Sequence, residues 1–189
     1  MELTWHGVSD RYKAQLAPDG LHLTQALANS VALAAPRDTD PLGELGTAQA
    51  WIEELANEWV KVHRGLVPDI TLTARGLTLV RRLRSTVRDA LLRETAATLW
   101  APIEISVEGD VLAVTPTGAD GRWLESAVGA ELLLAQQDNT LRRLKLCRNP
   151  ACRAAFYDLS KNSSKIWHDM AKCGTPMHVR EYRKRLKSL

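Results

Sequence analysis

The sequence predicts an α+β fold that is mostly helical. We expect a helical N-terminal domain with a small antiparallel β-hairpin or sheet, and a compact C-terminal module that ends in a helix. Three observations lead to this fold class. Apolar residues recur every three or four positions in long segments, two alternating segments flank a glycine-containing turn, and every cysteine lies near the C-terminus.

The first two helices are expected at residues 21–33 and 47–65. Residues 21–33 are apolar enough to pack into a core. The second segment is amphipathic, with its apolar stripe made up of Trp51, Ile52, Leu55, Trp59 and Val62. Five of the six tryptophans precede residue 140. Core packing is the favoured role for those on helical stripes, and lining of a pocket is the alternative.

A longer helix is expected from about Thr73 to residue 93. Its apolar stripe consists of Leu77, Val80, Leu83, Val87 and Leu91, and its other positions include Arg81, Arg82, Arg84 and Arg88. A row of arginines can form an anion site. More often it is a solvated face paired with nearby acidic side chains.

Residues 103–107 and 111–115 flank Glu108-Gly109-Asp110, which predicts a β-hairpin. Two strands alone are only marginally stable, so we expect the hairpin to lie against helices. Apolar residues from Trp123 to Leu133 then predict a third long helix that ends near Asp138.

The charge is divided unevenly along the chain. The 189 residues carry a formal net charge of +3, but residues 1–139 hold 12 Lys/Arg against 19 Asp/Glu, and residues 140–189 hold 13 against 3. We therefore expect a domain of residues 1–140 and a basic module of residues 141–189, with the boundary near residues 139–145. A basic module of this kind suits a polyanionic partner.

Several classes of protein do not fit the sequence. The N-terminus lacks the basic start and apolar core of a signal peptide, and the longest apolar runs, such as residues 31–35, are too short to cross a bilayer. We therefore expect a cytoplasmic protein without a membrane partner. Nucleotide-binding glycine loops and a Gly-x-Ser-x-Gly motif are also absent from the sequence, so we expect no enzyme.

The three cysteines point to a metal. Cys147 and Cys152 are five residues apart on a turn, and Cys173 follows His168 at the same spacing. Two such pairs can enclose one tetrahedral Zn²⁺, and four protein ligands would make that zinc structural. We expect the zinc-stapled module to be treble-clef-like or ribbon-like. The alternative is that the reduced cysteines pack as small hydrophobic side chains and His168 lies on the surface.

The last helix is expected to begin at Thr175-Pro176, with Thr as N-cap. One face would carry Val179, Tyr182, Leu186 and Leu189 and pack on the zinc module. The other face would carry the cations Arg180, Arg183, Lys184 and Lys187, with Lys165 nearby in sequence, and would track nucleic-acid phosphates. A solvated helix without a partner is the alternative.

Residues 145–186 resemble the CGNR zinc finger. The resemblance rests on the two cysteines of Cys147-x4-Cys152, on Phe156-x-Asp158-x-Ser160, on Trp167-His168-Asp169-Met170, on Cys173-Gly174 and on the closing Arg180-x-Tyr182-Arg183-x-Arg185. It implies that Cys147, Cys152, His168 and Cys173 bind zinc. It also implies an N-terminal ABATE domain, a looser match, and a bacterial stress-induced transcription regulator that binds DNA.

This chain departs from the family pattern at cationic positions. Thr175-Pro176 stands where the family has Asn-Arg, His178 replaces a Lys, and Lys165-Ile166 replaces two arginines. The sequence therefore supports two functions. The first is a transcription regulator with a zinc module that binds DNA and an N-terminal domain that senses a small-molecule effector or forms a homodimer. The second is a small-molecule-binding or protein-interaction protein with a purely structural zinc module.

Overall fold

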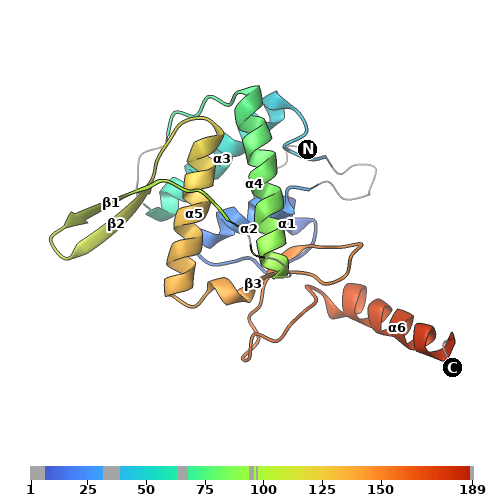
Figure 1. Ribbon diagram of the computed structural model, residues 1–189. Helices are drawn as coiled ribbons and strands as arrows, with labels where there is room; N and C mark the ends of the chain where they lie inside the picture. The colour runs from blue at the N-terminus through green and yellow to red at the C-terminus, as the bar shows by residue number, and fades with distance from the viewer. Residues whose placement is uncertain (1–6, 32–38, 64–67, 94–95, 97, 188–189) are drawn as a thin grey trace.

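The computed structural model describes residues 7–31, 39–63, 68–93, 96 and 98–187 (Figure 1). The helices are α1 (Gly7–Asp10), α2 (Leu21–Asn29), α3 (Leu45–His63), α4 (Ala74–Leu92), α5 (Gly121–Gln137) and α6 (Thr175–Lys187). The strands are β1 (Ile103–Glu108), β2 (Val111–Pro116), β3 (Leu144–Leu146) and β4 (Ala155–Tyr157). Two short helical turns are η1 (Leu141–Arg143) and η2 (Met170–Gly174). The mostly helical α+β fold class is confirmed.

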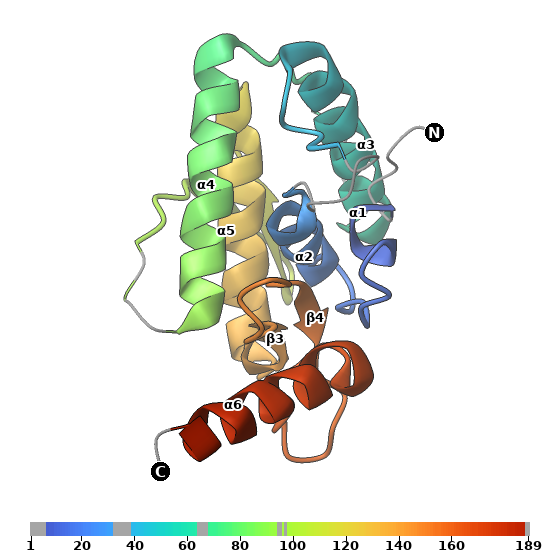
Figure 2. The same cartoon turned by 90° about the vertical axis from the view of Figure 1, so that its right-hand side faces the viewer.

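Helices α2 to α5 enclose the main core. α4 and α5 run side by side, and α2 and α3 lie beside them (Figure 2). The predicted stripes are buried, with Trp51, Trp59 and Trp123 at most 6% exposed, so these tryptophans belong to the core. Val62 at the end of α3 and Leu133 of α5 are exceptions, because they are 48% and 43% exposed. No helix among the described residues has both the length and the hydropathy of a membrane-spanning segment.

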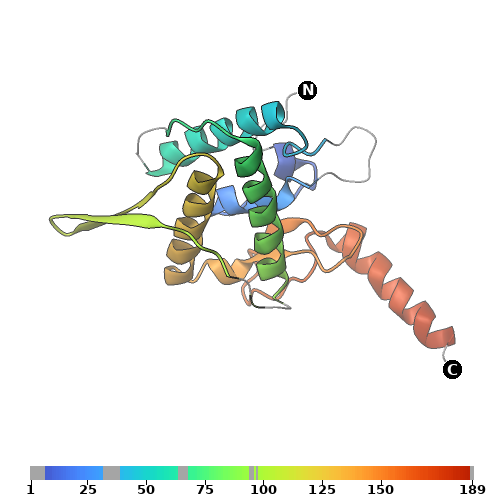
Figure 3. The same ribbon diagram turned by 45° about the horizontal axis from the view of Figure 1, so that its top comes forward.

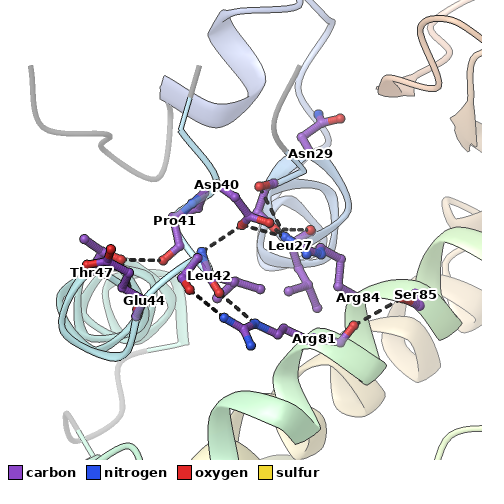
Figure 4. A network of polar contacts seen from close by, with 12 residues as sticks. Leu27, Asn29, Asp40, Pro41, Leu42, Glu44, Thr47, Arg81, Arg84 and Ser85 are labelled. Carbon is purple, nitrogen blue, oxygen red and sulfur yellow. Dashed lines mark hydrogen bonds and ion pairs between the residues drawn. The ribbon is translucent and has the colours of Figure 1, made fainter. Parts of the chain in front are cut away.

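Three of the α4 arginines donate hydrogen bonds to backbone carbonyls of other segments. Arg84 and Arg88 reach the end of α2, and the exposed Arg81 reaches the loop before α3. Arg84 lies 2.7 Å from Asp40 and donates to the Ser30 carbonyl, and Arg88 donates to the Ala28 carbonyl. Arg81 donates to the carbonyl oxygens of residues 42 and 43 (Figure 4). α2 ends at Asn29, earlier than the expected residue 33, and residues 32 and 33 lie outside the described part. The guanidinium groups satisfy carbonyls at this helix end, as cations commonly do.

The β1–β2 hairpin projects from the helices (Figures 1 and 3). Its antiparallel register pairs Val107 with Leu112 and Ile105 with Val114, so the apolar side chains share one face. The base of the hairpin contacts α5. The expectation that the hairpin lies against helices is wrong for its outer half, where Ile105, Val107 and Leu112 are 56–67% exposed.

The C-terminal module is built onto the helical core. Strands β3 and β4 pair antiparallel, and their residues Leu144, Leu146, Ala155 and Tyr157 belong to the main hydrophobic core. Two buried side chains of α2 bind the same strand: Gln25 and Asn29 both donate to the Ala155 carbonyl, and Asn29 accepts from the Ala155 amide at 2.7 Å. The expected boundary near residue 140 remains a prediction, and the described residues on either side of it share one core.

Candidate metal centre

The first pair of cysteines sits at the tip of the β3–β4 hairpin. Cys147 directly follows β3, and Cys152 lies three residues before β4. The connecting turn is held by Asn149, whose carbonyl accepts from the amides of Cys152 and Arg153 and whose side chain accepts from the Ala151 amide. Asparagine stabilises tight turns in this way. The local sequence therefore points both thiols to the same side.

The second pair comes from the start of the last helical segment. His168 precedes η2, and Cys173 lies within it. α6 begins at Thr175 as expected, but Thr175 is not its N-cap, because the turn η2 leads directly into the helix. Helical structure starts at Met170, and Asp169 caps it by accepting from the Lys172 amide at 2.9 Å. The wider π-helical turn, with the Thr175 amide bonded to the Met170 carbonyl, fits a proline that lies within helical structure.

The four candidate ligand atoms converge. One ligand atom from each of Cys147, Cys152, His168 and Cys173 lies within 4.8 Å of the others. The Cys152 and Cys173 sulfurs are 3.4 and 3.6 Å from His168 Nδ1. Tetrahedral Zn–S and Zn–N bonds place sulfur and nitrogen roughly 3.5 Å apart, so the donor set fits zinc. The first ligand pair lies at a hairpin tip, and the second lies at the start of a helical segment. Of the two expected arrangements, this is the treble-clef-like one.

The electrostatics of the cluster also favour a cation. The hydrogen bond with Cys152 lowers the pKa of the Cys147 thiol to about 4. That contact and burial raise the pKa of the Cys152 thiol, and burial raises that of Cys173. Three neighbouring thiols therefore resist joint ionisation when no positive charge is present. A bound Zn²⁺ supplies that charge and binds all three as thiolates.

Residues outside the ligand set support the cluster, and sequence reasoning assigned them no role. Asp158 is fully buried, lies 2.7 Å from Lys145 Nζ and accepts from the amides of Ser160 and Lys165. Burial alone would raise the pKa of the Asp158 carboxyl, but these hydrogen bonds hold it well below its usual range. The Asp-x-Ser spacing, which favours a local turn, was the available signal.

The N-terminal part of the chain also reaches the metal centre. Tyr12 is buried in a small core with Cys147, Phe156 and Cys173, and its ring meets that of His168 edge to face at 6.4 Å. This contact joins residues more than 130 positions apart in sequence. The metal centre therefore rests on the N-terminal segment as well as on its own hairpin and helix.

The expected nucleic-acid residues lie on an exposed surface. α6 has no buried residue, so Arg180, Arg183, Lys184 and Lys187 are exposed along the helix, and Lys165 is exposed on the loop before it. The expectation that the apolar face of α6 packs on the zinc module is wrong. Val179, Tyr182 and Leu186 are 42–63% exposed because α6 projects away from the body (Figures 1 and 3), and Leu189 lies outside the described residues.

The geometry of the four converging side chains is that of a zinc-binding module with four protein ligands. Residues 143–186 match the family model of the CGNR zinc finger. Together with the converging Cys147, Cys152, His168 and Cys173, the match supports one structural zinc ion. No curated protein matches the chain. The match does not include residues 1–142, so the ABATE resemblance of that part remains a prediction.

Proposed function

We propose that this protein is a bacterial transcription regulator whose zinc module binds DNA through α6. The observation that carries the proposal is the exposed, basic α6 that projects from the metal centre (Figure 3). Arg180, Arg183, Lys184 and Lys187 recur at the spacing of one helix face, and Glu181 is the sole acid among the thirteen residues. A helix about 20 Å long fits the major groove of B-DNA.

The remaining parts of the protein have supporting roles in this proposal. Zinc fixes the origin of α6, because Cys173 lies in the turn that leads directly into the helix. The N-terminal domain senses a small-molecule effector or mediates homodimer formation, in the cytoplasm. Dimerisation would place two basic helices on one duplex and strengthen binding.

The proposal includes no catalysis. Four protein ligands leave no open coordination position for a reacting water. The α3 residues with acid–base potential also have separate partners, since Glu53 contacts Gln49, Glu58 contacts Lys61, and His63 lies 2.6 Å from Glu131.

Salt-dependent binding to duplex DNA tests the proposal. Four phosphate contacts predict a log–log slope of affinity against salt of about −3.6. We expect replacement of Arg180, Arg183, Lys184 and Lys187 by Gln to bring this slope close to zero in fluorescence-anisotropy titrations. The matched control replaces four exposed cations of the N-terminal domain, Lys13, Lys61, Arg75 and Arg82, by Gln. Equal losses in both variants would contradict a DNA-binding role of α6.

A second function is favoured by the shared core. Because Leu144, Leu146 and Tyr157 pack in the main core, the zinc module also completes the fold of the N-terminal domain. In this alternative the protein binds a small molecule or another protein, and the zinc is purely structural. Absence of DNA binding by the zinc-loaded chain, together with saturable binding of a small molecule, would favour it.

A further inference from the structure

A pocket of about 430 Å³ lies where the base of the β1–β2 hairpin meets α3 and α5. Its walls include Trp59 and His63 of α3, Trp123 and Leu134 of α5, and Leu112 and Val114 of β2. Volume and lining both fall in the range typical of small-molecule sites, which are mainly apolar and aromatic with a few polar groups. The pocket is separate from the metal centre and from α6.

The hairpin contributes backbone as well as side chains to this pocket. Residues 112–118 line it without a gap, although successive side chains of a strand point to opposite faces. The edge of β2 therefore borders the pocket. β2 pairs with β1 alone among the described strands, so this second edge offers unpaired backbone donors and acceptors to a ligand.

The imidazole that lines the pocket lies against an indole ring and close to a buried carboxylate. His63 stacks on Trp59 with ring centroids 4.2 Å apart, and its Nε2 lies 2.6 Å from Glu131 Oε1. The Glu131 side chain is buried and also accepts from Trp59 Nε1 at 2.6 Å. Its carboxylate is thus engaged by two protein groups. The imidazole lines the cavity together with Thr115 and Thr117 of the hairpin side.

The lining also limits the charge of a ligand. Among the described residues that line the pocket, none is Arg, Lys, Asp or Glu. A charged ligand would lose its hydration without gaining an ionic partner, which is costly. Flat walls of indole, imidazole and strand edge favour a planar molecule.

We propose that this pocket binds an uncharged, largely apolar heteroaromatic molecule with at least one hydrogen-bonding group. The inference rests on the sensing role proposed for the N-terminal domain and assigns that role a site and a class of ligand. The ligand lies between Trp123 and the base of β2, with its polar edge toward His63 or the backbone of residues 112–118.

Binding of Nile red, an uncharged planar dye with a carbonyl acceptor, tests the proposal on the full zinc-loaded chain. We expect saturable fluorescence enhancement with one dye per chain. Leu112→Glu places a carboxylate at the pocket wall and should weaken dye binding at least tenfold. Val107→Glu is the matched control, because Val107 is the cross-strand partner of Leu112 on the same apolar face but lies outside the pocket.

Both positions are more than half exposed, so both variants are expected to unfold at the wild-type temperature. Equal weakening by the two substitutions would show that the dye binds the hairpin face and would overturn the proposal, as would a lack of saturation. Hydrogen exchange on the wild-type chain gives a second readout that needs no variant: saturating dye should protect the amides of residues 112–115 and leave those of α6 unchanged. DNA binding by Leu112→Glu, measured without dye, separates failure of this site from failure of the proposed function.

Discussion

Asp120 shows how one residue can hold two helices together. Its backbone has a φ of 58°, a conformation that residues other than glycine rarely adopt. Its carboxylate accepts from the amide and the hydroxyl of Thr73, the N-cap of α4. The contact is close because Gly76 has no side chain: a Cβ there would lie 1.6 Å from Asp120 Oδ1. Asp120 lies at the N-terminus of α5, and its carboxylate hydrogen-bonds to the N-terminus of α4. These hydrogen bonds offset the backbone strain at Asp120.

We therefore predict that Asp120→Ala lowers the free energy of unfolding by about 1–2 kcal/mol, as measured by urea denaturation. Burial opposes ionisation of Asp120, but the Thr73 hydrogen bonds win and lower its pKa. The carboxylate thus stabilises the fold at a pH above the unfolded pKa of about 4, and this contribution is lost as pH falls below that value. The difference between wild type and variant should shrink in that range. Asp110→Ala, at the exposed hairpin tip, should change stability by less than about 0.5 kcal/mol.

Among the helices, α4 carries arginines that hydrogen-bond to α2 and hold it in place. Its apolar stripe faces the core, and Arg84 reaches the end of α2 (Figure 4). Arg88 likewise donates to the Ala28 carbonyl of α2. Burial lowers the pKa of Arg88. The sequence showed the row of cations but not these partners, which lie 54 and 60 residues away.

Arg84→Ala should lower the free energy of unfolding by about 2 kcal/mol, because it removes charge-assisted bonds to Asp40 and to the Ser30 carbonyl. Arg84→Lys should recover part of the loss, since lysine keeps the charge without the planar fork. Arg82→Ala, on the same helix but exposed, is the control and should lie within about 0.5 kcal/mol of wild type. A similar loss in Arg82→Ala would show that the effect does not come from the hydrogen bonds of Arg84.

At the scale of the whole molecule, the metal centre and the helical core depend on each other. Tyr12 and Asn29 reach the module from the N-terminal part, and Leu144 and Tyr157 of the module enter the main core. Structural zinc sites contribute on the order of 10–16 kcal/mol of apparent binding energy, comparable to the total stability of a domain. Loss of the metal should therefore destabilise parts of the fold that lie far from the four ligands.

We predict one zinc per chain by metal analysis, and a single thermal transition that moves to lower temperature when zinc is removed by a chelator. Fluorescence of the buried tryptophans Trp51, Trp59 and Trp123 should report the same midpoint as circular dichroism. His168→Ala should lose stoichiometric zinc. His178→Ala, an exposed histidine ten residues away, should retain it. Separate transitions for the module and the helices would contradict the coupling.

Local pattern and local chemistry account for the features that could be predicted from the amino-acid sequence. Periodicity predicted α3, α4, α5 and the hairpin, because a buried stripe needs apolar residues at a fixed spacing. Two short ligand spacings predicted the metal set, because a tetrahedral ion accepts few arrangements. In both cases the residues that carry the signal, a helical stripe or a ligand pair, are spaced only a few positions apart in the chain.

Features that join distant segments of the chain could be seen only in the three-dimensional fold. The roles of Arg84 and Asp158, the contact of Tyr12 with His168, and the exposure of Val179 and Tyr182 all depend on which element lies opposite. The amphipathic pattern of α6 is the same whether its apolar face is covered or not. A pattern records that a face is apolar, but packing between elements decides whether that face is buried.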